Sequence, residues 1–261
     1  MKNILTLIDK EWAELIRDRF VLLTVLLPTV LFPVILLGVM LGLGTKMDEP
    51  PSNIPEAWLH LPLLSGLSPA QVGMAMMVLY FINLSLVVPL IAPMTIAVHS
   101  IIGEKQSGSL EPLLATPIET MELFLGKVLA ASLPGVAMGW LNYLLMILVV
   151  GWRAPALLSR VVLAPATMLL LLLGTPILAV LSVSLGVIIS SRMNDVRAAQ
   201  QLGGIVVLPV VGLAITQMVG KIILGPVMIM VLLLLLLLAD ALLIRLGVDR
   251  FGRETVLTRW R

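Results

Sequence analysis

The feature that most constrains this chain is a series of long stretches that carry no Asp, Glu, Lys or Arg, or at most one. A helix needs about 20 apolar residues to cross the hydrocarbon core of a bilayer. The sequence therefore predicts an all-α integral membrane protein with six transmembrane helices. We place the spans at about residues 20–44, 71–102, 128–151, 161–191, 202–220 and 222–244. Only Gly220 and Lys221 separate the last two, so a re-entrant hairpin there is an open alternative.

The composition excludes most other classes of protein. Hydrophobic residues make up 59% of the chain and charged residues 12%, whereas soluble proteins have about 45–50% and about 25%. Such a chain cannot cover its own surface with polar groups, which excludes a soluble enzyme or a nucleic-acid-binding protein. The chain contains no cysteine, so disulfides, thiol nucleophiles and cysteine metal sites are excluded as well.

The positions of the basic residues predict the orientation in the membrane. Thirteen of the 17 Lys and Arg residues lie in residues 1–19, in the second and fourth loops and in the tail, 245–261. Basic residues near the ends of spans are retained on the cytoplasmic side. We therefore expect a multi-pass protein of the cell membrane with both termini in the cytoplasm.

Residues 1–19 are predicted to form an amphipathic helix in the membrane interface, ahead of the six-span domain, residues 20–261. Apolar side chains recur there at spacings of three and four residues, as in a helix with one apolar face: Ile4, Leu5, Ile8, Trp12, Leu15 and Ile16. Trp12 would lie at the level of the lipid headgroups. The helix is either a passive anchor or a lever between the membrane and a cytoplasmic partner.

Motifs for chemistry within the chain are absent from the sequence. Lys127 follows Gly126, but Val128 stands where a phosphate-binding loop requires Ser or Thr, and the earlier glycine of that motif is missing. The chain is therefore not expected to hydrolyse ATP, and no residues show the spacing of a catalytic or metal site. Asp240 and His99 are the candidates for an ion relay in the membrane, but both lie near the cytoplasmic ends of their spans, which favours structural roles.

The loop between the second and third spans, residues 103–127, reads GEKQSGSLEPLLATPIETMELFLGK. Ser109 can cap a short helix that has Glu111 in its first turn. Thr116 and Glu119 form a second capping pattern around Pro117, at the start of a helix that runs into the third span. The loop is thus predicted to be a stiff elbow, which can transmit the motion of a partner to the attached spans.

This loop closely resembles the signature of type-2 ATP-binding-cassette (ABC) transporter permeases. The similar segments are residues 103–105 (Gly-Glu-Lys), 108–111 (Gly-Ser-Leu-Glu), 113–117 (Leu-Leu-Ala-Thr-Pro) and 125–127 (Leu-Gly-Lys). The resemblance extends to the layout of essentially the whole chain, with its amphipathic first helix and six spans. The sequence of residues 113–117 also resembles the corresponding sequence in the branch that contains sodium-efflux-type permeases.

The resemblance implies a homo- or heteromeric permease dimer in the lipid bilayer, bound to two ABC ATPase subunits. No cofactor is expected on this chain, because ATP and Mg would be bound by the ATPase. In such families the loop helix docks in a groove of the ATPase, and closure of the ATPase pair switches the pathway, normally for export. The contact would be made by Glu104, Leu110, Glu111, Leu113, Leu114 and Thr116 of the loop, flanked by Asp9, Lys10, Glu11 and Arg17 of the first helix.

Two patterns in the spans concern helix packing. Gly38 with Gly42 and Gly135 with Gly139 are small residues four apart, which allow close helix contacts. We expect these contacts within the chain, with a seam between two copies as the alternative. Prolines that predict kinks occur at positions 28, 33, 89, 93, 134, 165, 176 and 209.

Two further functions are alternatives to transport powered by a separate ATPase. A membrane scaffold or assembly factor could use the same elbow without transport. A gradient-driven carrier would depend on Asp240. The lack of buried charge favours an apolar, amphipathic or lipid-linked substrate.

Overall fold

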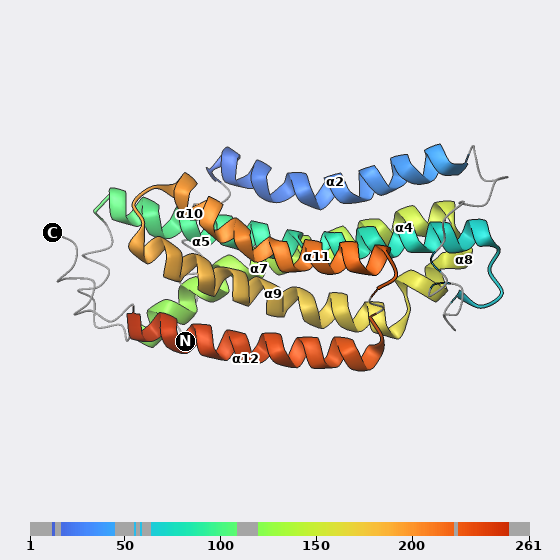
Figure 1. Cartoon of the computed structure of the whole chain (residues 1–261). Helices are drawn as coiled ribbons and strands as arrows, with labels where there is room; N and C mark the ends of the chain where they lie inside the picture. Colours follow the sequence, from blue (N-terminus) through green and yellow to red (C-terminus); the bar gives the residue numbers. More distant parts are fainter. Residues whose placement is uncertain are drawn as a thin grey trace.

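A computed structural model describes residues 12–13, 17–44, 55, 58, 64–108, 120–221 and 224–250 (Figure 1). All regular elements within these ranges are helices, which confirms the predicted all-α class. Six helical segments are long and apolar enough to cross a membrane, as predicted. They are Val21–Gly42, Pro69–Gln106, Phe124–Arg153, Pro165–Arg192, Val196–Met218 and Pro226–Val248.

The described residues form eleven helical elements, some of which are short. The long helices are α2 (Arg19–Gly44), α4 (Pro69–Ser85), α5 (Val88–Gln106), α7 (Thr120–Arg153), α9 (Pro165–Arg192), α11 (Val207–Met218) and α12 (Pro226–Arg250). The short ones are α8 (Pro155–Leu157), the π-helical turn η2 (Leu158–Val162), α10 (Val196–Gly203) and the 3₁₀ turn η3 (Gly204–Val206).

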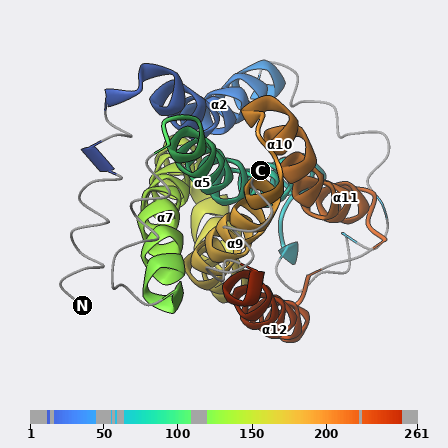
Figure 2. The ribbon, with the colours of Figure 1, turned by 90° about the vertical axis from the view of Figure 1, so that its left-hand side faces the viewer.

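Helices α5 and α9 form the centre of the bundle, and α2, α7, α12 and the α10–α11 pair surround them (Figure 2). The outer helices expose apolar side chains, for example Leu234, Leu238 and Leu242 of α12. Such a surface requires lipid around it. The described start of α2, the ends of α5, α9 and α12, and the start of α7 all lie at one end of the bundle, which we call the loop end (Figure 1).

The second span is one predicted stretch but two helices. Helix α4 ends at Ser85 and α5 begins at Val88, with a turn between them. Pro89 causes this break, because it has no N–H to donate to the carbonyl of Ser85. On the α4 side, the Nδ2 of Asn83 donates to Oε1 of Gln217 in α11, 2.7 Å away. The two halves of this span therefore have different neighbours.

The fourth loop is shorter than predicted, and the fifth span begins earlier. Helix α9 continues to Arg192, and α10 begins at Val196 after Asp195 caps it by accepting from the N–H of Arg197 at 3.1 Å. The small and polar residues of this segment lower its hydropathy, but they form an amphipathic helix with Ala199 buried against the bundle. The helical segment that is long and apolar enough to form the fifth span thus starts at residue 196, six residues before the predicted start.

The fifth and sixth spans are connected by a turn. Helix α11 ends at Met218, and Gly220 has a φ of +76°, which favours glycine. A methyl group at Gly220 would also lie 2.9 Å from the Cβ of Pro55, beside the buried Trp58. The connection, residues 219–225, is too short for a re-entrant pair of half-helices.

Proline-containing segments of the central helices lie at the same level of the bundle. The ring of Pro93 in α5 occupies the space that a side chain at Gly135 of α7 would need. One turn later in α7, a methyl group at Gly139 would lie 2.6 Å from Cγ2 of Thr175 in α9 and 3.6 Å from Cβ of Pro89 in α5. The second Gly-x-x-x-Gly pair is therefore packed within the chain, against helix segments that contain proline.

We call the prolines, the glycines and the polar residues that lie at this level the kink layer. It comprises Pro89 and Pro93 of α5, Pro134, Gly135, Gly139 and Asn142 of α7, Thr175 and Pro176 of α9, and Thr29 and Pro33 of α2, which Asn142 joins to α7.

The first Gly-x-x-x-Gly pair is placed differently. A methyl group at Gly38 or at Gly42 of α2 would meet no atom of the described chain within 4 Å. No described residue therefore packs closely against these two positions of α2.

Candidate functional site

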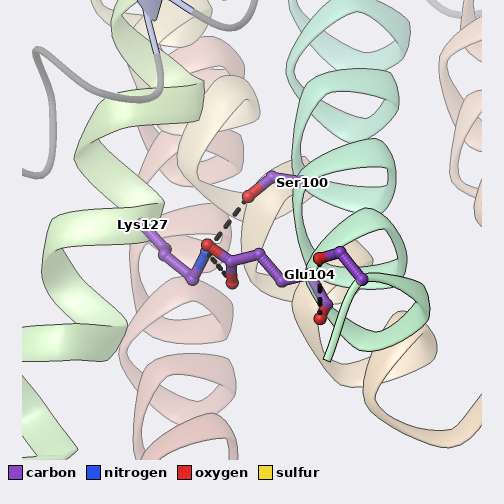
Figure 3. Close-up of polar contacts among 4 residues, drawn as sticks. Ser100, Glu104 and Lys127 are labelled. Atoms are coloured by element: carbon purple, nitrogen blue, oxygen red, sulfur yellow. Dashed lines mark hydrogen bonds and ion pairs between the residues drawn. The ribbon is translucent and has the colours of Figure 1, made fainter. Parts of the chain in front are cut away.

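The candidate site is the base of the loop between the second and third spans, where α5 ends and α7 begins. The Nζ of Lys127 in α7 lies 2.7 Å from Oε2 of Glu104 in α5, and it donates to the Oγ of Ser100 at 3.0 Å (Figure 3). The side chains of Lys127 and Glu104 are 4% and 6% exposed. The two helices that carry the loop are therefore joined directly beneath it.

Such a buried ion pair fixes geometry more than it adds stability. Removing both charges of such a pair is often neutral, but removing one partner costs about 3–5 kcal/mol because a charge is left buried without its partner. Glu104 and Lys127 therefore hold α5 and α7 at a set distance.

Lys105, the next residue of α5, points to a different helix. Its Nζ donates to the carbonyls of Ser190, Ser191 and Met193, at 2.7, 2.8 and 3.1 Å. These carbonyls lie at the C-terminal end of α9, where the last turn of a helix has no N–H partners and the helix dipole favours a cation. Lys105 thus caps α9 with its ammonium group. Gln106 adds a hydrogen bond from its Nε2 to the carbonyl of Asn194 at 3.2 Å.

Two consecutive residues of α5 therefore bind two different helices. Glu104 holds α7 and Lys105 holds α9. We call Ser100, Glu104, Lys105 and Lys127 the loop clamp. The loop clamp thus joins the same three helices, α5, α7 and α9, that also contact one another in the kink layer.

The structure describes only two of the residues that were predicted to contact the ATPase. Glu104 is described and buried in the loop clamp, so its carboxylate does not lie on the outer surface of the chain. Arg17 is described and exposed at the loop end. The others lie outside the described residues: Asp9, Lys10, Glu11, Leu110, Glu111, Leu113, Leu114 and Thr116. The predicted helix starts at Ser109 and Thr116 also lie there, and the chain is helical from Thr120 onward.

Sequence reasoning did not identify Lys105 and Lys127 as structural residues. Both counted only as basic residues at the ends of spans. The available signal was their placement, with Glu104 and Lys105 in the last turn of one long helix and Lys127 in an apolar segment of another. A lysine among apolar residues needs a counterion, and Glu104 is the acidic residue in the last turn of the helix on the other side of the loop.

Asp240 differs from its expected surroundings. It was expected to reach the interface or a basic neighbour, but its side chain is 5% exposed, on the face of α12 that carries the buried residues Ile229 and Leu233. Its Oδ1 has no hydrogen-bond partner among the described residues. Within the same part of the chain, no group of three or more His, Asp or Glu side chains could hold a metal ion.

The geometry describes a membrane bundle whose central helices are tied together beneath one loop. A comparison with protein families agrees with it over nearly the full length: the family model described as "ABC-2 family transporter protein" matches residues 5–253. The chain belongs to the ABC-2 transporter family. A comparison with curated proteins gave no match.

Membership of the ABC-2 family accounts for the architecture described above. The chain is a multi-pass membrane protein and forms the membrane domain of an ABC transporter. The match extends across the second and third spans and the loop between them, so it includes the loop clamp. Membership also implies association with an ABC ATPase.

Proposed function

We propose that the chain is the permease subunit of an ATP-driven exporter and is moved by a separate ATPase through the loop of residues 103–127. The observation that carries this proposal is the loop clamp, because it connects the base of the loop to α7 through Glu104 and to α9 through Lys105. A loop that only linked two spans would not need to be fastened to a third helix.

The proposed mechanism follows from two layers of contacts. ATP and Mg are bound by the ATPase, whose closure moves the loop. The loop clamp makes the ends of α5, α7 and α9 move together, and the kink layer lets these ends rotate relative to the rest of the bundle. A pathway that opens on one side of the kink layer would then close on the other.

The complete transporter in this proposal contains two permease chains, identical or paralogous, and two ATPase subunits. Both termini and the loop face the cytoplasm of a cell membrane. The distribution of charge supports this orientation, because the described basic residues concentrate at the loop end. They are Arg17, Arg19, Lys105, Lys127, Arg192, Arg197, Arg245 and Arg250, against Arg153, Arg160 and Lys221 at the other end.

The test is co-purification of the chain with an ABC ATPase from the same cell, followed by measurement of ATP hydrolysis in the reconstituted complex. The permease should stimulate hydrolysis, and Glu111→Lys should reduce the stimulation while the complex still assembles. Lys221→Glu, a charge change at the opposite end of the bundle, is the matched control and should leave it unchanged. Equal stimulation by the parent and Glu111→Lys would contradict coupling through this loop, and assembly without any stimulation would favour a scaffold.

A second candidate function rests on Asp240, whose buried carboxyl group lacks a partner for Oδ1. Buried ionisable residues in membrane helices often mark an ion pathway. A gradient-driven carrier predicts that Asp240→Asn abolishes transport and that transport proceeds without ATP. The ATP-driven exporter predicts that transport stops when ATP is removed.

A further inference from the structure

One contact joins the N-terminal segment to the third span. The Nε1 of Trp12 donates to the backbone carbonyl of Ala130, 3.1 Å away. Ala130 lies in α7, 118 residues along the chain, and is buried. Trp12 is partly exposed, so burial of the indole ring alone does not account for the contact.

The carbonyl of Ala130 is a special acceptor because of Pro134. In an α-helix the carbonyl of residue i accepts from the N–H of residue i+4, and Pro134 has no N–H to give to Ala130. Within a membrane bundle little water is available to replace the lost donor. The indole N–H of Trp12 therefore supplies the bond that the proline removes.

The position of this contact links it to the elements that are proposed to move. Ala130 lies about one turn after Lys127 of the loop clamp and about one turn before Pro134 and Gly135 of the kink layer. The contact thus acts on the short part of α7 between the loop clamp and Pro134. A bend that opens or closes at Pro134 changes the direction of the Ala130 carbonyl and makes or breaks the contact with Trp12.

We propose that Trp12 is a latch through which the N-terminal segment sets the bend of α7. When Trp12 is bound to Ala130, the kinked form of α7 is stabilised, because its unpaired carbonyl is satisfied. When the N-terminal segment is displaced, that stabilisation is lost. The latch concerns α7 itself and stands whether or not the partner of the loop is an ATPase.

The bend can be measured directly because the chain has no cysteine of its own. We would replace Met121 and Leu148 by cysteine and attach spin labels. These exposed residues lie on either side of Pro134 in α7, about 40 Å apart along a helix that rises 1.5 Å per residue. Pulsed electron paramagnetic resonance on the full-length chain in lipid nanodiscs then reports the distance distribution across the kink.

The test compares Trp12→Phe, Pro134→Ala and the double variant. Trp12→Phe keeps the aromatic ring but removes the donor, and it should shift or broaden the distribution. Pro134→Ala restores the N–H at position 134, so it should give a longer and narrower distribution, and adding Trp12→Phe should then change nothing. Trp140→Phe, an exposed tryptophan of the same helix, is the matched control and should match the parent.

Two results would overturn the latch. One is a Trp12→Phe distribution equal to that of the parent. The other is an equal effect of Trp12→Phe with and without Pro134, which would mean that the ring acts by packing and not by donating to the carbonyl that the proline leaves free.

Discussion

The side chain of Asn142 in α7 donates from Nδ2 to the backbone carbonyl of Thr29 in α2, 2.8 Å away. Pro33 lies four residues after Thr29, so this carbonyl has no N–H partner within its own helix. A side chain of one helix thus satisfies the backbone of another at the point where a proline bends it. The same arrangement occurs between Trp12 and Ala130, whose carbonyl lies four residues before Pro134.

We expect Asn142→Leu to destabilise the protein, because it removes the donor for Thr29. Side-chain hydrogen bonds between membrane helices contribute about 0.6 to 2 kcal/mol. Reversible unfolding in mixed micelles measures this loss. Pro33→Ala restores a backbone donor for Thr29, so in that background the loss should be smaller. An equal loss in both backgrounds would show that Asn142 acts through packing alone.

Gly139→Ala should destabilise the bundle, whereas Gly42→Ala should be neutral or slightly stabilising. The added methyl group at residue 139 meets Cγ2 of Thr175, while at residue 42 it meets no described atom within 4 Å. Overpacking costs about 1–3 kcal/mol, and alanine is the better helix former. Thermal unfolding of the purified chain compares the two. Thr175→Ser removes the colliding methyl group and should restore part of the stability of Gly139→Ala.

The loop clamp predicts a specific pattern of rescue. Lys127→Met leaves the carboxylate of Glu104 buried without a cation and should cost about 3–5 kcal/mol. The double variant Glu104→Leu with Lys127→Met removes both charges and should regain most of that loss. Thermal stability in detergent provides the measurement. A double variant no more stable than Lys127→Met would mean that the two side chains do not act as a pair.

Lys105→Met should loosen the C-terminal end of α9 and leave the rest of the bundle intact. The variant loses the ammonium group that binds three carbonyls between Ser190 and Met193. Hydrogen–deuterium exchange should therefore become faster in the last turn of α9 and in the turn before α10, where local opening requires less free energy. Lys221→Met at the opposite end provides the control, with no change at α9. Unchanged exchange at α9 would remove Lys105 from the loop clamp.

The number of spans and their approximate limits could be predicted from sequence, because an uncharged apolar stretch of sufficient length has few alternatives to crossing a membrane. The helical structure of the segment around α10 could not be predicted in this way. Its residues are too polar to count as part of a span, and whether they form a loop or a helix is decided by Ala199 and Gly203, which pack against the bundle.

The prolines could be identified from sequence, but the sequence did not show that they lie at the same height in neighbouring helices. That height depends on the register between helices, which Gly135 fixes against Pro93 and Gly139 against Thr175. For the same reason, the charge of Lys127 predicted which side of the membrane it faces but not its pairing with Glu104 across the two helices.

Helix α7 contains 34 residues, which at 1.5 Å per residue extend about 51 Å. The hydrocarbon part of a bilayer is only about 30 Å thick. Helix α7 is therefore too long to lie within the hydrocarbon part alone, and part of it must extend into the headgroup region or beyond. If that part is the loop end, a protein that binds there meets a short stalk above the bilayer and need not touch the lipid.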